Sequence, residues 1–236
     1  MVAFTGVVTS LSEAQAALLK SYDFNGNLSD TLGNGVPLTS AEGSISGGRY
    51  SFPNNQGLRL TSALPSTTDY GIEMRLRVDD SVDGYNKLID FQDLSSDLGL
   101  YILNGQITFY TLSSRFGRVS VGTDFTLGLA RSLGSIEVFL NGTSLFTAAD
   151  TSNQAVPLSN VLNFFIDDNQ TTTGQLESFA GSVDFIRIHN DSSTFGTEPT
   201  VVPEPTSLTF LGAATAMGFG ASFKRKLAKK KQDKGE

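Results

Sequence analysis

The sequence contains no cysteine, no tryptophan and one histidine. Thiol nucleophiles, disulfides, cysteine zinc sites and metal sites built from several histidines are therefore excluded. Glycine and phenylalanine are abundant, at 24 and 17 of the 236 residues. This composition is typical of short strands joined by tight turns, and it favours an all-β fold.

Charge is distributed unevenly along the chain. Residues 1–200 contain 10 Lys and Arg against 21 Asp and Glu, which gives 10 − 21 = −11, whereas residues 201–236 contain 7 against 3, which gives +4. An acidic body is repelled by phosphate backbones, so we expect no nucleic-acid binding. The basic tail needs a separate explanation.

The tail has three parts in a fixed order. The motif Val202-Pro203-Glu204-Pro205 precedes an uncharged run at 206–223, and six cations follow: Lys224, Arg225, Lys226, Lys229, Lys230 and Lys231. An uncharged run of this length spans about 27 Å as a helix, close to the thickness of the bilayer core. We predict a linker at 196–206, a single transmembrane helix at 207–223 and a basic cytoplasmic tail at 224–236. A buried C-terminal helix is the alternative.

This ordered set of segments resembles the PEP-CTERM sorting signal of exported bacterial proteins. The resemblance implies a partner of the exosortase type, which removes the tail from an inner-membrane intermediate and sends the protein to the cell surface or exterior. A permanent membrane anchor is the alternative.

Residues 1–16 have features of an export signal. An apolar stretch at 2–11 precedes Ala14-Gln15-Ala16, which resembles the small-residue cleavage site of a secretory signal peptide. No Lys or Arg precedes Lys20, so we expect the remnant of a truncated signal peptide. The alternative is a short helix capped by Ser10 and Glu13.

Between residues 21 and 190 the hydrophobic pattern is that of strands. Apolar residues alternate with others over 70–78, and Asn104-Gly105 and Asn141-Gly142 each lie between two apolar runs. Asn-Gly suits type I′ turns, so we predict two hairpins within an antiparallel sandwich. Further strands are expected at 58–60, 87–91, 125–131, 162–166 and 183–188.

The ends of this region resemble laminin-G-like domains of the concanavalin A-like class. The segments 22–30 and 181–188 are similar to the opening and closing strands, and 87–91, 99–101 and 136–142 to the central hairpins. The resemblance implies an all-β jelly-roll sandwich of two antiparallel sheets over 17–195, with its first and last strands side by side.

No catalytic constellation is recognisable. The Glu-x-Asp-x-Glu triplet of glycanases with this fold is absent, and the nearest carboxylate pairs are Asp90 with Asp93 and Asp167 with Asp168. Loop Asp pairs usually solvate a turn, and His189 is interpreted as a surface residue. We therefore expect no enzyme, with a glycan-active hydrolase or lyase as the alternative.

One loop has the oxygen ligands that calcium prefers. Asp23, Asn25 and Asn27 occupy alternate positions, and the family resemblance brings Asp184 of the last strand near them. We predict a structural Ca²⁺ site at these four residues and no required cofactor. The alternative is that these side chains cap turns.

The ligand is left open by the sequence. Tyr85, Tyr101 and Tyr110 are candidates for an aromatic sugar-binding platform, although strand aromatics are more often core residues. We expect an exported, non-catalytic surface or extracellular-matrix protein that binds carbohydrate or protein. Its expected partners are the exosortase, an extracellular polysaccharide, and the membrane through the C-terminal helix.

Overall fold

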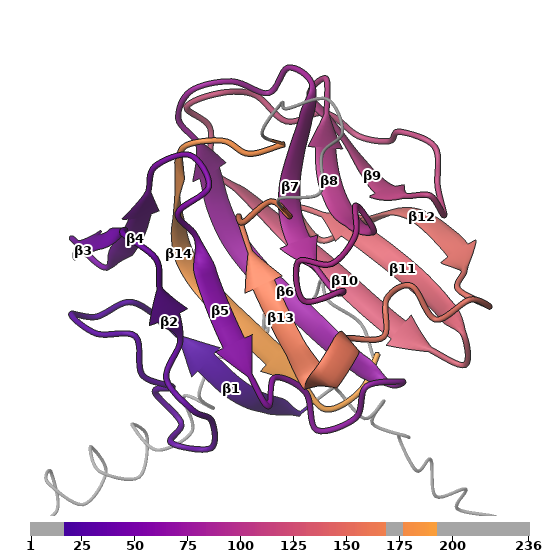
Figure 1. Ribbon diagram of the computed structural model, residues 1–236, viewed down its shortest axis with the longest axis horizontal. Coiled ribbons are helices and arrows are strands. Elements are labelled where there is room, and N and C mark those ends of the chain that lie inside the picture. Colours follow the sequence, from indigo (N-terminus) through magenta and orange to yellow (C-terminus); the bar gives the residue numbers. More distant parts are fainter. Residues whose placement is uncertain (1–16, 169–176, 193–236) are drawn as a thin grey trace, which may run out of the picture. The chain divides into compact units, whose positions relative to one another are not determined.

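The computed structural model describes residues 17–168 and 177–192. In these ranges the chain forms antiparallel strands arranged in two sheets, and Figure 1 shows one sheet lying in front of the other. The predicted all-β sandwich of two antiparallel sheets is thereby confirmed.

The larger sheet has eight strands in the order β12-β11-β10-β6-β14-β4-β3, with β1 paired to β14. Tyr22 of β1 pairs with Ile186 of β14, so the first and last strands lie side by side as expected. The strands are β1 (Leu18–Tyr22), β3 (Ser44–Ser46), β4 (Arg49–Phe52), β6 (Tyr70–Val78), β10 (Phe125–Ser132), β11 (Ser135–Leu140), β12 (Thr143–Ala149) and β14 (Gly181–His189).

The smaller sheet has six strands in the order β2-β5-β13-β7-β8-β9. It is the sheet nearer the viewer in Figure 1. Its strands are β2 (Thr39–Ser40), β5 (Leu58–Thr61), β7 (Tyr85–Asp90), β8 (Gly99–Leu103), β9 (Gln106–Tyr110) and β13 (Val161–Phe164), and the short 3-10 turn η1 (Leu158–Asn160) leads into β13.

The hydrophobic core lies between the two sheets. The alternating apolar residues of β6, from Tyr70 to Val78, are each at most 1% exposed, as the alternation predicts. Phe52 of β4 stacks on Phe165, which follows β13 of the other sheet, with 4.3 Å between ring centroids. Each such burial contributes about 1.5–3 kcal/mol, so this chain without cysteines needs no disulfide to hold its sheets together.

Both predicted Asn-Gly hairpins are present. Asn104 and Gly105 have φ of 50° and 75°, and Asn141 and Gly142 have 51° and 75°. A third two-residue hairpin, which the sequence pattern did not predict, joins β10 to β11 through Leu133 and Gly134 with φ of 50° and 73°. Leucine rarely adopts positive φ, which is why the pattern gave no signal there.

Two predicted strand boundaries are wrong. The opening strand is Leu18–Tyr22, and most of the segment 22–30 is a loop. The carboxylate of Asp30 folds this loop back by accepting hydrogen bonds from the backbone N–H groups of Ser21, Leu32, Asn34 and Gly35. The predicted strand at 162–166 ends at Phe164, because Phe165 turns the chain with a φ of 60°.

The remaining predicted segments lie outside the described residues. These are the signal-peptide remnant at 1–16, the linker beyond residue 192, the transmembrane helix at 207–223 and the basic tail. Within 17–168 and 177–192, no helix is long and apolar enough to cross a membrane.

Candidate functional site

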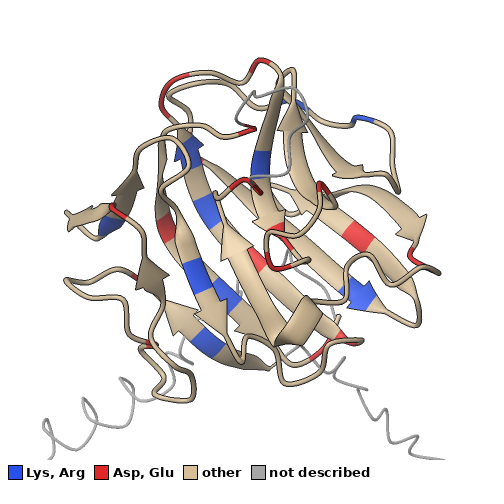
Figure 2. Ribbon diagram, in the orientation of Figure 1, with Lys and Arg blue, Asp and Glu red and all other residues tan. Residues whose placement is uncertain are grey.

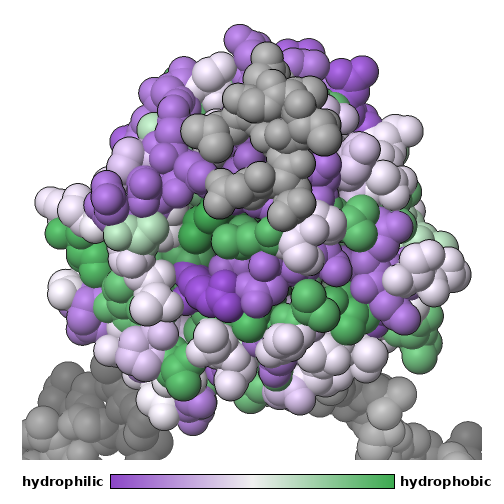
Figure 3. Space-filling view, in the orientation of Figure 1, coloured by the Kyte–Doolittle hydropathy of each residue, from purple (hydrophilic) through white to green (hydrophobic). Residues whose placement is uncertain are grey.

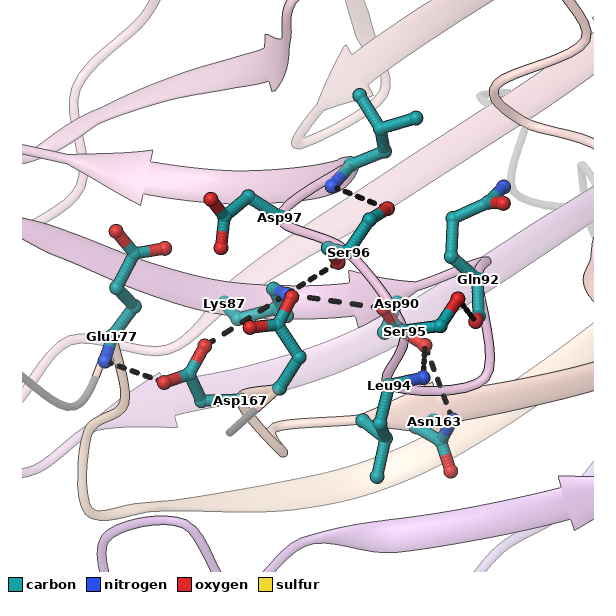
Figure 4. Close-up of polar contacts among 12 residues, drawn as sticks. Lys87, Asp90, Gln92, Leu94, Ser95, Ser96, Asp97, Asn163, Asp167 and Glu177 are labelled. Carbon is teal, nitrogen blue, oxygen red and sulfur yellow. Dashed lines mark hydrogen bonds and ion pairs between the residues drawn. The ribbon is translucent and has the colours of Figure 1, made fainter. Parts of the chain in front are cut away.

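The six-stranded sheet carries polar side chains on its outer face. Lys87 of β7 pairs with Tyr101 of β8, and Asp90 pairs with Asn163 of β13. Residues 91–98, which join β7 to β8, cover this face together with residues on both sides of the segment 169–176 (Figure 4). These covering loops bury polar groups that would otherwise face solvent.

Lys87 lies at the centre of the covered face and is 0% exposed. Its Nζ is 3.1 Å from Oδ2 of Asp168, 3.8 Å from Oδ2 of Asp90 and 3.8 Å from Oδ1 of Asp167. The ammonium also donates to the carbonyl oxygen of Ser96 at 3.4 Å (Figure 4). One buried cation therefore faces three buried carboxylates.

Two of these carboxylates are incompletely satisfied. Oδ1 of Asp90 accepts hydrogen bonds from the Leu94 N–H and the Asn163 side chain, and Oδ2 of Asp167 accepts one from the Glu177 N–H. The second oxygens, Asp90 Oδ2 and Asp167 Oδ1, are buried and accept no hydrogen bond within the described chain. Burial raises the pKa of both carboxyls, and the backbone hydrogen bonds and Lys87 offset only part of that rise.

Asp97 and Glu177 add further negative charge at the rim of this cluster. Burial raises the pKa of Glu177, and the nearby Asp167 raises it further. Burial and the nearby Asp168 likewise raise the pKa of Asp97. Figure 2 shows acidic segments gathered around the one basic segment of β7. Five carboxyl groups thus surround the single ammonium of Lys87. We call these six residues the Lys87 cluster: Lys87, Asp90, Asp97, Asp167, Asp168 and Glu177.

Three tyrosine rings lie directly beside the Lys87 cluster. Tyr85 meets Tyr101 edge-on at 5.5 Å and Tyr110 at 5.9 Å between ring centroids, and the Lys87 ammonium is 5.2 Å from the centroid of Tyr101. Tyr101 is 0% exposed and its hydroxyl donates to the carbonyl oxygen of Asp97, whereas Tyr110 is 38% exposed. The structure therefore brings together the three tyrosines that the sequence analysis singled out.

The rings and the rim carboxylates enclose a hollow of about 70 Å³, lined by Tyr85, Asp97, Tyr110 and Glu177. We call it the tyrosine hollow. On the part of the same face that Figure 3 leaves uncovered, hydrophilic groups run between apolar ones rather than around one broad apolar patch. A mixed surface of this kind suits a polar ligand better than a wide apolar partner.

Three of the four residues of the predicted calcium site make contacts within the protein. Asp23 accepts hydrogen bonds from the hydroxyls of Ser21 and Thr31, and Asn27 accepts one from the Ser29 N–H. Asp184 lies 3.8 Å from the Arg75 guanidinium on the larger sheet. Asn25 is exposed. No cluster of three or more acidic or histidine residues within 17–168 and 177–192 is arranged to hold a metal ion.

The other carboxylates and the histidine fall in different places. Asp93 pairs with Arg59 rather than with Asp90, and this ion pair lowers the pKa of Asp93. Asp167 and Asp168 do not solvate a turn as expected, because both are buried against Lys87. His189 is half-buried and ends β14 of the larger sheet, apart from the Lys87 cluster of the smaller one.

The predicted sorting motif, Val202, Pro203, Glu204 and Pro205, and the six cations from Lys224 to Lys231 lie outside the described residues. The sequence analysis did not predict the Lys87 cluster. Its one local signal is a lysine and an aspartate placed among the apolar residues of a single strand, Lys87-Leu88-Ile89-Asp90.

The fold is shared with solved protein structures. Domain 4 of AbnA, an extracellular GH43 arabinanase from Geobacillus stearothermophilus solved in complex with arabinotriose, is 16% identical with a TM-score of 0.59, over 77% of this chain and 96% of that domain. Trypanosoma rangeli sialidase in complex with sialic acid is 14% identical with a TM-score of 0.57, over 80% of this chain and 33% of the sialidase.

A further similar structure is the binding domain of botulinum neurotoxin serotype D, which is 14% identical with a TM-score of 0.54, over 76% of this chain and 49% of that one. This chain therefore spans about a third of the sialidase and about half of the toxin domain. No protein-family model matches the sequence, and no curated protein is significantly similar to it. At these identities the likeness establishes the β-sandwich fold alone.

Proposed function

We propose that this chain is an exported, non-catalytic bacterial surface or matrix protein whose β-sandwich binds carbohydrate at the tyrosine hollow. The observation that carries the proposal is the pairing of accessible rings with carboxylates: the half-buried Tyr85 and the exposed Tyr110 line the same hollow as Asp97 and Glu177. Sugar rings pack their C–H faces on aromatic rings, and their hydroxyls donate to carboxylate oxygens.

The position of the hollow supports this proposal. Strands hold both of its rings, with Tyr85 at the start of β7 and Tyr110 at the end of β9, and Asp97 and Glu177 lie in the adjoining loops. The buried ring of Tyr101 contacts both exposed-side rings and supports them. A pre-formed platform of this kind avoids the entropy cost of ordering side chains on binding. The fold shared with an arabinanase domain that was solved with arabinotriose is compatible with carbohydrate binding.

The binding experiment uses the full chain in a screen against polysaccharides, followed by calorimetry with the best ligand. Tyr110→Ala is expected to weaken binding about ten-fold, since an aromatic contact is worth roughly 1 kcal/mol beyond its burial. Phe116→Ala is the matched control, because Phe116 is 37% exposed, like Tyr110, but stacks on Phe146. Equal losses in the two variants would contradict the proposal, as would the absence of any bound glycan.

Export is the second part of the proposal, and its support is the ordered tail. The Pro-Glu-Pro motif at 203–205, an uncharged span and the basic cluster at 224–231 resemble a PEP-CTERM signal. Intact-mass analysis of the protein from its native host is expected to show that the basic cluster has been lost. Recovery of Lys224–Glu236 still joined to the domain outside the cell would contradict processing by an exosortase.

A glycan-active hydrolase or lyase is the second candidate. It is favoured by the pKa values of Asp97 and Glu177, which are both raised and belong to carboxyls lining the same hollow. Two carboxyl groups at one site, of which one donates a proton and the other acts as base or nucleophile, are the arrangement used for cleavage of glycosidic bonds. The best-binding polysaccharide is therefore assayed for new reducing ends. Release that Glu177→Gln abolishes would favour the enzyme over the binding protein.

A further inference from the structure

The charge balance around the tyrosine hollow restricts the ligand. The Lys87 cluster sets five carboxyl groups against one ammonium, and that ammonium is fully buried and is not among the groups that line the hollow. We infer that the tyrosine hollow binds a protonated amine carried on a sugar, which makes the ligand an amino-sugar polymer. This inference rests on the proposed function and names its substrate class.

The protein already places one ammonium group, that of Lys87, against an aromatic ring and a carboxylate. Lys87 Nζ lies 5.2 Å from the centroid of the Tyr101 ring and 3.1 Å from a carboxylate oxygen of Asp168. The hollow presents the same two kinds of group on its open side, the rings of Tyr85 and Tyr110 and the carboxyls on its rim. Aromatic faces and carboxylates together select cations, because the ring quadrupole and the negative charge attract the same group.

The buried carboxylate of Asp167 adds to the negative charge next to Glu177, whose backbone N–H donates to it. Oδ1 of Asp167 is buried, accepts no hydrogen bond in the described chain, and lies 3.8 Å from Lys87, beyond hydrogen-bond distance. A buried carboxylate without sufficient counter-charge is costly, and a second cation nearby would reduce that cost. The same field repels acidic sugars, so uronates and sialic acid are expected to bind poorly.

The size of the hollow determines how the polymer binds. A volume of about 70 Å³ is far below the roughly 300–1,000 Å³ of pockets that enclose a whole small ligand. It accepts one substituent of a sugar ring while the rest of the polymer lies across the sheet face. Removing the charge from that substituent should therefore remove most of the affinity.

The test compares two tetrasaccharides with the same backbone, the glucosamine tetramer and its N-acetylated form. Calorimetry with the full chain is done at about pH 6, where the amine is protonated, and at two salt concentrations. The glucosamine tetramer is expected to bind at least about ten-fold more tightly, and added salt should reduce the difference. Equal or tighter binding of the N-acetylated tetramer would overturn the inference and leave carbohydrate binding in place.

Substitutions of the two rim carboxyls test whether the preference for the amine arises at the tyrosine hollow. Asp97→Asn and Glu177→Gln are each expected to weaken glucosamine-tetramer binding about five-fold and to weaken binding of the N-acetylated tetramer by less, because only the charged amine loses an ionic partner. Asp184→Asn is the matched control, because Asp184 is an aspartate of the larger sheet whose side chain is 38% exposed. A loss of equal size in Asp184→Asn would show a general charge effect and would overturn the site.

A lysine tetrapeptide carries the same charge without a sugar. It is expected to bind much more weakly than the glucosamine tetramer, and equal binding would overturn the assignment to an amino sugar. If neither tetramer binds while another glycan does, the inference fails and the proposed function stands. If no glycan binds at all, both fail.

Discussion

Replacement of Lys87 by methionine tests the charge balance of the Lys87 cluster directly. Methionine keeps most of the apolar stem of lysine and removes only the ammonium, which is 0% exposed. Asp90, Asp167 and Asp168 then lose the cation that lies 3.1 to 3.8 Å from their oxygens. We expect the protein to fold with a lower free energy of unfolding and to bind a proton in compensation.

The magnitude follows from that proton. Protonating one carboxyl restores the original net charge of the cluster. An aspartate in the unfolded chain has a pKa of about 3.9, so keeping one protonated in the folded protein costs about 1.36 kcal/mol for each pH unit above that value. The loss is therefore about 4 kcal/mol at pH 7 and about 1.5 kcal/mol at pH 5. The first value agrees with the roughly 3–5 kcal/mol measured when one partner of a buried ion pair is removed.

The assay is urea unfolding of both proteins at these two pH values. Arg75→Met is the matched control, because Arg75 lies 3.8 Å from Asp184 in a pair whose side chains are 48% and 38% exposed. An exposed pair is worth about 0–1 kcal/mol, so this variant should cost little at either pH. A loss below about 1 kcal/mol in Lys87→Met at pH 7, or a loss equal at both pH values, would refute the reasoning.

Three further predictions concern the fold. Gly57→Ala should lower the free energy of unfolding by about 3 kcal/mol in urea, because an added Cβ would lie 1.9 Å from the Phe164 carbonyl oxygen; an unchanged midpoint would contradict this packing. Burial raises the pKa of the Asp30 carboxyl, but its four backbone hydrogen bonds lower that pKa by more, so the contribution of Asp30 to stability is present at neutral pH and is lost as the pH falls through the lowered pKa. Asp30→Ala should therefore cost about 2–3 kcal/mol at pH 7 and little in acid, whereas a pH-independent cost would contradict the carboxylate's role. Leu133→Asn should raise the melting temperature, with a gain of about 0.5–1 kcal/mol, because Leu133 is 100% exposed with a φ of 50°; a lower melting temperature would contradict the turn geometry.

The sequence predicted those parts of the fold that depend on local patterns. The alternation in β6 depends only on neighbouring residues, and an Asn-Gly pair specifies its own turn, so both were placed correctly. The hairpin at Leu133 was missed because its first turn residue adopts positive φ against its intrinsic preference.

The Lys87 cluster depends on contacts that no local pattern reports. Lys87 and Asp168 are far apart in the chain and meet because β13 pairs with β7. An irregular register between Lys87 and Ile89 interrupts the simple alternation of inward and outward residues. Burial on the outer face comes from the covering loops, which hydrophobic periodicity does not describe.

The interpretation of Asp23, Asn25 and Asn27 shows a different limit. Alternating oxygen side chains are typical both of calcium loops and of loops that satisfy their own backbone. In the structure, Asp23 and Asn27 accept hydrogen bonds within their own loop. The sequence pattern alone does not separate the two possibilities, because the same ligand atoms serve both.

The buried Arg131–Asp150 ion pair and the Lys87 cluster differ in how completely their carboxylate oxygens are hydrogen-bonded. Arg131 and Asp150 are 1% and 0% exposed, and Asp150 accepts hydrogen bonds from Arg131, Gln154 and Ala155, so each of its oxygens is satisfied. The Lys87 cluster leaves buried carboxylate oxygens without a hydrogen bond. Replacing a buried charged cluster by apolar side chains of similar volume often stabilises a protein, so these buried carboxylates lower the free energy of unfolding. Asp167 accepts a hydrogen bond from the N–H of Glu177, and Glu177 lines the tyrosine hollow, so a cation bound in the hollow would lie near this uncompensated charge.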